Sequence, residues 1–162
     1  MINPLFQNVV ILINGSESSI HASQYGIMMA KLYRCNLKAV YVVDTATLKQ
    51  LTLRKFFVAE ESEEYQQSLE SDGLRYLKYV EDLAKAKGVK MEVELRRGAI
   101  WSEVIASAED MKANAILLGG ITVSGSEQRS VLTDSYHQIL TNAPCSVLMV
   151  KEPMVEQLYK LE

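Results

Sequence analysis

Residues 115–150 constrain the fold of this 162-residue chain more than any other segment. They contain two short apolar runs, Ile116-Leu117-Leu118 and Val147-Leu148-Met149-Val150, with a glycine-led loop after the first run. A helix is expected between the runs, and it must end before Pro144 because the residue before a proline is pushed out of helical conformation. A glycine pair between a buried strand and a helix is a common place for phosphate groups to bind in α/β proteins.

Three further segments are predicted to be strands. Residues 9–13 form an unbroken apolar run, which is typical of a strand buried on both faces of a parallel sheet. Residues 39–43 repeat this pattern. Residues 91–95 alternate apolar side chains with Glu92 and Glu94, so one face meets water and we expect this strand at a sheet edge.

Apolar residues at helical spacing predict helices between these strands, at about 16–33, 63–87 and 100–111. Residues 45–62 show no clear period, and we expect a long, partly helical connection there. The alternation of strands and helices predicts a doubly wound α/β fold, with five parallel strands and helices on both faces. We expect one domain over residues 1–152 and a C-terminal tail at 153–162.

Composition limits the classes of function. With 48% hydrophobic and 23% charged residues, the chain can bury a sizeable core in one domain. A formal net charge of −3 gives no basic surface for a nucleic-acid backbone. The start of the chain lacks the basic and apolar regions of a signal peptide, and no apolar run approaches the roughly 18 residues of a membrane span. We therefore expect a soluble, cytoplasmic protein that binds neither nucleic acid nor membranes.

No residue pattern predicts a metal site or a catalytic centre. Cys35 and Cys145 lack the paired spacing of zinc or redox motifs, and we expect buried, reduced thiols. His21 and His137 fall on predicted helices without a third ligand or a nucleophile placed beside them. We expect no metal and no enzyme activity.

Five pieces of sequence, in this order, resemble the universal stress protein family over about residues 8–151. They are Asn14-Gly15-Ser16-Glu17-Ser18-Ser19, Val40-Tyr41-Val42-Val43-Asp44, Arg97-Gly98, Leu117-Leu118-Gly119-Gly120, and Ala143-Pro144-Cys145-Ser146-Val147-Leu148-Met149-Val150. The resemblance implies a Rossmann-like sheet with strand order 3-2-1-4-5. It also implies a ligand crevice at the carboxyl ends of the first and fourth strands.

Many members of that family bind ATP or AMP through a glycine motif, G-x2-G-x9-G-[ST]. Here Gly120 matches the first glycine, whereas Val123, Thr133 and Asp134 stand at the other three positions. The family's aspartate after the first strand falls on Asn14. The resemblance implies a vestigial or atypical adenine-nucleotide crevice made of Ile13, Asn14, Val42, Gly119, Gly120, Val123, Thr133, Asp134 and Ser135.

These departures weaken the phosphate site. β-Branched Val123 and Thr133 hinder the close approach and positive φ that glycine allows. Asp134 is expected near the start of the fourth helix, where it would accept the N–H groups that a phosphate needs. A phosphate charge about 4 Å from that carboxylate would be repelled by roughly 4 kcal/mol at an effective dielectric of 20. We therefore expect no nucleotide cofactor, and ATP or AMP bound through an atypical loop is the alternative.

Two enzyme or signalling classes with related sheets fit less well. A pyrophosphate-loop ATPase needs a second glycine and an aspartate after the first strand, and 14–19 lacks both. A response-regulator receiver needs an acidic pair there and a phosphoacceptor aspartate after the third strand, and neither is present. We expect a stress-response protein that acts through contacts with an unknown protein partner.

The last predicted strand suggests a homodimer. In the order 3-2-1-4-5, residues 147–150 lie at a sheet edge, yet all four are apolar. Proteins blunt, cover or pair such an edge, because its free backbone groups template association. We expect two copies to pair there, as the resemblance also implies. The alternative is that the tail at 153–162 folds back over the edge.

Overall fold

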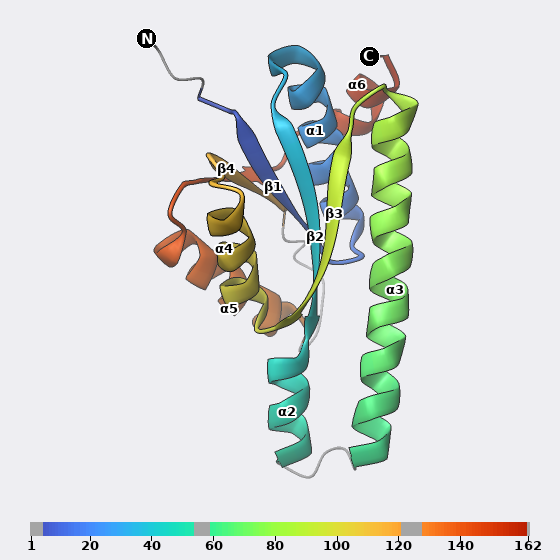
Figure 1. The fold of residues 1–162 in the computed structure, drawn as a ribbon, viewed down its shortest axis with the longest axis vertical. Coiled ribbons are helices and arrows are strands. Elements are labelled where there is room, and N and C mark those ends of the chain that lie inside the picture. Colours follow the sequence, from blue (N-terminus) through green and yellow to red (C-terminus); the bar gives the residue numbers. More distant parts are fainter. Residues whose placement is uncertain (1–4, 54–58, 121–127, 162) are drawn as a thin grey trace.

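The structure is a computed structural model that describes residues 5–53, 59–120 and 128–161. It contains a five-stranded parallel sheet of order β3-β2-β1-β4-β5, which confirms the predicted topology (Figure 1). The strands are β1 (Asn8–Ile13), β2 (Asn36–Asp44), β3 (Met91–Gly98), β4 (Ala115–Gly119) and β5 (Ser146–Val150).

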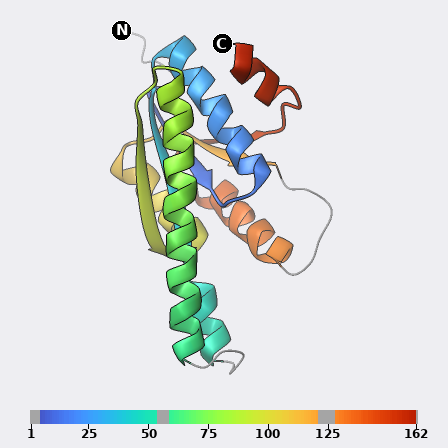
Figure 2. The same ribbon diagram turned by 90° about the vertical axis from the view of Figure 1, so that its right-hand side faces the viewer.

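Helices cover both faces of the sheet. They are α1 (Glu17–Tyr33), α2 (Thr45–Leu53), α3 (Ala59–Ala86), α4 (Ile100–Asp110), α5 (Gln128–Asn142) and α6 (Val155–Leu161). Helices α1 and α3 pack on one face, and α4 and α5 on the other (Figures 1 and 2). No helix in the described ranges is both long and apolar enough to cross a membrane.

The apolar pattern of each strand agrees with its place in the sheet. Strand β1 lies between β2 and β4, and its residues from Val9 to Ile13 are at most 1% exposed. At the outer position, β3 pairs only with β2, and its Glu92 and Val93 are exposed. The alternating strand is therefore the edge strand, as predicted.

Helix α1 begins after the N-cap Ser16, close to its predicted start at about residue 16. Ser16 has extended backbone angles, and its Oγ accepts the Ser19 N–H at 3.2 Å. Such a cap satisfies one of the free N–H groups of a first turn. The helix ends at Arg34, whose backbone is left-handed. The first turn of α1, which Ser16 caps, lies against Gly119 at the carboxyl end of β4.

The connection after β2 is more regular than its sequence suggested. Helix α2 begins directly after β2, and Asp44 caps it by accepting the Thr47 N–H at 3.0 Å. Helix α3 begins at Ala59, earlier than predicted, and extends with α2 beyond the end of the sheet (Figure 1). Strand β3 also continues three residues past the predicted end, to Gly98. Helices α2 and α3 together form an arm beside the carboxyl ends of the strands.

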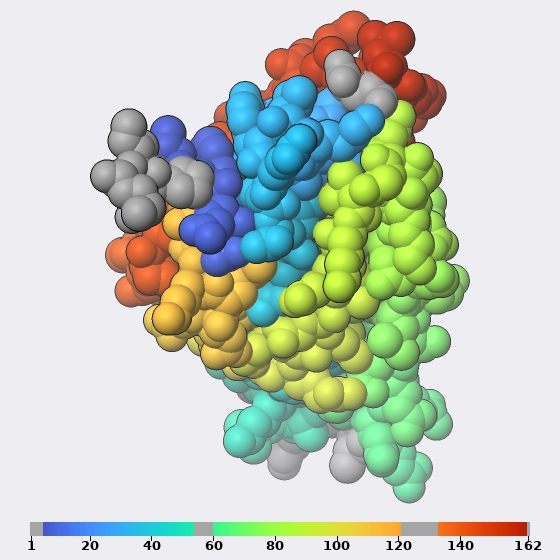
Figure 3. Space-filling model, turned by 45° about the horizontal axis from the view of Figure 1, so that its top comes forward, coloured from blue at the N-terminus to red at the C-terminus, as the bar shows by residue number. Residues whose placement is uncertain are grey.

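The C-terminal tail folds into α6, which packs on α1. Val155 and Tyr159 are buried, and the Tyr159 hydroxyl donates to the Leu83 carbonyl of α3 at 2.6 Å. In Figure 3, α6 lies at the pole of the molecule where α3 ends. The tail thus docks on α1 and α3, whereas β5 pairs with β4 at the sheet edge.

Candidate functional site

The direction in which the chain adds strands to the parallel sheet reverses between β1 and β4, and the candidate site lies at this switch point. Strand β1 continues to β2 on one side, with Ile13 level with Tyr41, while β4 lies on the other side. Open α/β sheets bind ligands in the crevice at the carboxyl ends of such strands. Two cavities meet at this end of the present sheet.

The first cavity has a volume of about 380 Å³. Two residues of the predicted crevice, Asn14 and Val42, line it together. Its other walls come from β2, α2, α3 and α4, through Tyr41, Asp44, Thr47, Leu48, Leu51, Tyr65, Leu69 and Ile100. The volume falls within the roughly 300–1,000 Å³ typical of small-molecule sites, and most of the lining is apolar or aromatic.

The orientation of the Asn14 amide follows from its contacts with Ser16. Its Oδ1 accepts the Ser16 N–H at 3.0 Å and the Ser16 hydroxyl at 2.5 Å. A backbone N–H can only donate, so the amide must present its oxygen on that side. The Nδ2 group, a double donor, is therefore the part of Asn14 that is left for the cavity and for Tyr136.

Tyr136 of α5 lies behind Asn14 in the core. It is 2% exposed, and its hydroxyl has no hydrogen-bond partner of acceptable geometry among the described residues. Burial raises the pKa of Tyr136 to about 12, and the Asn14 side chain, a polar neighbour, opposes that rise. The phenol thus stays protonated and keeps its O–H donor in the core next to Asn14.

Asp44 lines both cavities and also holds α2. Its Oδ1 accepts the Thr47 N–H at 3.0 Å, and its Oδ2 accepts the Thr47 hydroxyl at 2.6 Å. Each carboxylate oxygen can accept a further bond, so capping leaves acceptor capacity and the full negative charge at the cavity wall. The sequence analysis closed β2 with Asp44 but did not assign it to the site.

The second cavity has a volume of about 520 Å³ and shares Asp44, Thr47 and Ile100 with the first. Asp134 and Ser135, both predicted crevice residues, line it from α5. The remaining walls are formed by Ala46, Gln50, Ala99, Trp101, His137 and Gln138. The structure therefore divides the predicted crevice between two neighbouring cavities.

The expected place of Asp134 in its helix is wrong. Helix α5 begins at Gln128, so Asp134 lies in the second turn, beyond reach of the free N–H groups of the first turn. Its carboxylate is exposed and contributes charge to the second cavity instead of capping the helix. Thr133 beside it is also exposed. Val123 lies outside the described residues.

The glycine pair and Ile13 line neither of these cavities. Gly119 is buried against the first turn of α1, where an added Cβ would lie 2.5 Å from the Ser18 carbonyl carbon. At Gly120 an added Cβ would lie 3.4 Å from the Val150 carbonyl oxygen, an ordinary contact. Ile13 is fully buried in the core. Close packing against α1 thus explains Gly119 without a ligand.

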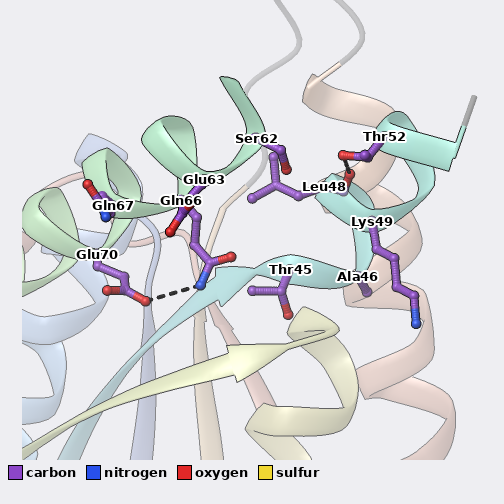
Figure 4. A pocket seen from close by; sticks show the side chains of 10 residues that line it. All are labelled: Thr45, Ala46, Leu48, Lys49, Thr52, Ser62, Glu63, Gln66, Gln67 and Glu70. Carbon is purple, nitrogen blue, oxygen red and sulfur yellow. Dashed lines mark hydrogen bonds between the residues drawn. The ribbon is translucent and has the colours of Figure 1, made fainter. Parts of the chain in front are cut away.

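A third cavity, of about 680 Å³, lies between α2 and α3 (Figure 4). Its lining is mostly polar, and the sequence analysis did not identify it. Glu70 accepts a hydrogen bond from Gln66 at 3.3 Å and pairs with Arg97 at 2.5 Å. These bonds hold the pKa of Glu70 below its ordinary value. The contacts tie α3 to β3 and account for part of this polar lining.

No group of three His, Cys, Asp or Glu side chains in the described ranges is arranged to hold a metal ion. His21 lies 3.9 Å from Glu17 on the surface of α1. Both cysteines are free, and Cys35 is buried whereas Cys145 is only half-buried. Burial raises the pKa of both thiols, which favours the unreactive protonated form.

Known proteins are similar in both sequence and fold. The model of the universal stress protein family matches residues 5–151. A curated universal stress protein of Methanocaldococcus jannaschii is 33% identical over 153 residues, which cover 94% of this chain and 86% of the relative. The solved universal stress protein UspA from Lactobacillus plantarum has a TM-score of 0.71 and 18% identity, covering 92% of this chain and 100% of that chain.

Several solved structures of similar fold contain a nucleotide. One of them is a universal stress protein family protein from Arabidopsis thaliana with AMP bound. Its TM-score is 0.65 and its identity 14%, with coverage of 93% of this chain and 94% of that chain. At this identity the likeness concerns the fold.

Proposed function

The chain belongs to the universal stress protein family, and we propose that it acts in the stress response through contacts with other proteins, without catalysing a reaction. In this proposal the switch-point crevice receives the adenosine end of a nucleotide but holds its phosphates weakly or not at all. The observation that carries it is the division of the predicted crevice. Asn14 and Val42 share an apolar cavity, whereas Asp134 puts a carboxylate in the adjoining one.

The adenosine half of the proposal is supported by the shape of the first cavity. It lies at the switch point and is lined by Asn14, which offers amide donors, and by Val42 at the end of β2. The AMP complex of the Arabidopsis relative shows that this fold can hold such a ligand. A nucleoside-sized group therefore suits this cavity in size and in polarity.

The phosphate half is supported by the residues at the motif positions. Asp134 brings negative charge where the family motif has a hydroxyl, and Thr133 replaces a glycine. A carboxylate in a cavity wall repels a phosphate and offers it no donor. An adenine nucleotide bound through an atypical loop is the alternative function.

The absence of catalysis is supported by the chemistry of the cavity walls. Within the described part of the chain, no metal-ligand cluster is present. The Thr47 hydroxyl donates to Asp44 in the wall of both cavities, but the same carboxylate is engaged in capping α2 through the Thr47 N–H. Hydrolysis of a phosphate ester needs a base or an ion to activate water. Binding, rather than turnover, is what this lining supports.

We also propose that two copies associate through β5. Residues Val147, Leu148 and Met149 of this edge strand are half-buried, and α6 docks on α1 and α3. An apolar edge strand is a template for pairing with another chain. This proposal is supported by the apolar side chains of β5 and by its place at the end of the sheet, where it pairs with β4 on one side.

Calorimetry with ATP and AMP tests the proposed function. We expect no micromolar affinity at nucleotide concentrations up to the millimolar range, and no nucleotide released when the purified protein is denatured. The combined change Val123→Gly, Thr133→Gly and Asp134→Ser should partly restore binding, because it returns the glycines and the hydroxyl of the motif. Micromolar binding by the wild-type protein, or ATP hydrolysis that Asn14→Ala abolishes, would contradict the proposal.

A further inference from the structure

We propose that the crevice selects an adenosine whose 5′ substituent is uncharged or positively charged over one that carries phosphate. The inference rests on the proposed function, because it takes the first cavity as the adenosine subsite. It adds the class of ligand, which is a neutral nucleoside or an adenosine bearing an amine or a sulfonium group. The argument depends on the charges and hydrogen-bond donors around the two cavities.

The charges in the walls are negative. Asp44 stands in the wall that both cavities share, and Asp134 lines the second. The described lining of these two cavities includes no lysine and no arginine. Lys49 lines the separate cavity between α2 and α3, and Lys151, beside Gly120, lines neither switch-point cavity. A 5′ group that extends from the first cavity into the second therefore meets two carboxylates.

One feature of the second cavity favours anions, but it is weaker. Helix α4 begins there at Ile100, and its N-cap Ala99 provides no side-chain hydrogen bond. The N-terminal end of a helix carries roughly half a positive charge. The charges of two carboxylates outweigh that partial charge. The described charges of the cavity wall thus disfavour a phosphate.

Apart from Asp44, the described lining of the first cavity is uncharged, and Asn14 supplies hydrogen-bond donors there. Because Ser16 occupies the Asn14 Oδ1, Nδ2 is the group that Asn14 can offer to a ligand in the cavity that it lines. Donors of this kind suit neutral acceptors such as a ring nitrogen or a ribose oxygen. The apolar walls from Leu48, Leu51 and Leu69 suit the faces of a base. Recognition of the nucleoside part therefore needs no phosphate.

Asp44 connects the two cavities and defines the preferred 5′ group. Its oxygens each accept one bond from Thr47 and keep capacity for another. An ammonium or sulfonium group at the shared wall would be attracted to this carboxylate and to Asp134, whereas a phosphate would be repelled by both. The neutral hydroxyl of adenosine itself is neither attracted as a cation nor repelled as a phosphate, so its expected affinity lies between the two.

Calorimetry near pH 7 with three matched probes tests the inference. The probes are 5′-amino-5′-deoxyadenosine, adenosine and AMP, which share the base and ribose and differ in charge. We expect affinity to fall in that order, by about tenfold or more between the first and the last, with a smaller spread at 1 M salt. Equal affinities, or AMP binding as tightly as adenosine, would overturn the inference.

Variants that remove one carboxylate charge test whether Asp134 and Asp44 cause the selectivity against AMP. Asp134→Asn and Asp44→Asn should each raise the affinity for AMP relative to adenosine about threefold or more, and asparagine at 44 can still cap α2. Glu109→Gln is the matched control, because it removes one exposed charge on α4 outside both cavities. An unchanged ratio in both aspartate variants, with folding verified by circular dichroism, would show that these carboxylates do not set the selectivity.

The outcomes separate this inference from the proposed function. Millimolar adenosine and aminoadenosine that both fail to bind would overturn the inference and the adenosine half of the proposed function, but a stress-response role through protein contacts would stand. Adenosine that binds as weakly as AMP would overturn the inference alone. Micromolar binding of AMP would overturn both. Binding in the expected order, with ATP inert, would support both.

Discussion

Gly119 and Ser18 lie so close that a Cβ on the glycine would be 2.5 Å from the Ser18 carbonyl carbon. This contact brings the first turn of α1 against the end of β4 at the switch point. The Gly119-Gly120 pair therefore has two different roles. Gly119 allows α1 to pack closely on β4, whereas Gly120 has room for a side chain beside Val150 of β5.

Gly119→Ala should destabilise the protein by about 1–3 kcal/mol, because an added methyl group must displace backbone atoms of α1. Urea denaturation followed by circular dichroism measures the loss. Gly120→Ala is the matched control, since its Cβ would meet only ordinary contacts. Equal stability of the two variants would contradict the packing role of Gly119.

Tyr159→Phe should lower the free energy of unfolding by about 1 kcal/mol, because it removes the 2.6 Å hydrogen bond to the Leu83 carbonyl. Truncation after Glu152 should cost more, since it also exposes core area that Val155 covers. Thermal unfolding of both variants measures these losses. Leu161→Ala, at a side chain that is 83% exposed, should have little effect. A truncated chain as stable as the wild type would show that α6 does not contribute to the fold.

Glu94 should make stability sensitive to acid. Burial raises the pKa of this carboxyl, but hydrogen bonds from Ser107 and Arg96 and the charges of Lys38 and Arg96 outweigh burial, so the pKa lies below its ordinary value. Because the pKa of Glu94 is lower in the folded than in the unfolded chain, its carboxylate stabilises the fold at pH values above the unfolded pKa of 4.5. This stabilisation is lost as the pH falls through the folded pKa.

Glu94→Gln should therefore weaken the acid-dependent loss of stability below about pH 5. At neutral pH the same variant should cost about 1–3 kcal/mol, because the buried Lys38 loses its carboxylate partner. Urea denaturation at a series of pH values tests both statements. Glu92→Gln, on the exposed part of the same strand, is the control. Parallel pH profiles for wild type and Glu94→Gln would refute this account.

Leu148→Lys or Met149→Lys should convert a dimer into monomers, because each puts a charge beside the β5 edge. Sedimentation velocity at tens of micromolar measures the mass, and circular dichroism confirms that the variants remain folded. Truncation after Glu152 should leave any dimer intact, since α6 docks on α1. A wild-type protein of about 18 kDa in solution would rule the dimer out.

Much of the fold could be predicted because local patterns report which faces are buried. The unbroken apolar run at 9–13 became the central strand β1, and the alternating run at 91–95 became the edge strand β3. The order of the five strands came from resemblance to a family. Of the predicted crevice, Asn14 and Val42 meet in one cavity with unpredicted walls from α2 and α3, and Asp134 and Ser135 meet in the adjoining one.

By itself, the sequence determined the layered sheet, the start of α1 near residue 16 and the family. The tertiary structure decided where charge and donors stand. It brought Asn14 and Val42 into one cavity with side chains of α2 and α3, and it placed Asp44 in a wall that this cavity shares with the one beside Asp134. The physical reason is the distance along the chain between the residues that interact. Apolar patterns and helix caps depend on residues close in sequence, whereas a cavity arises where segments distant in sequence leave space between them.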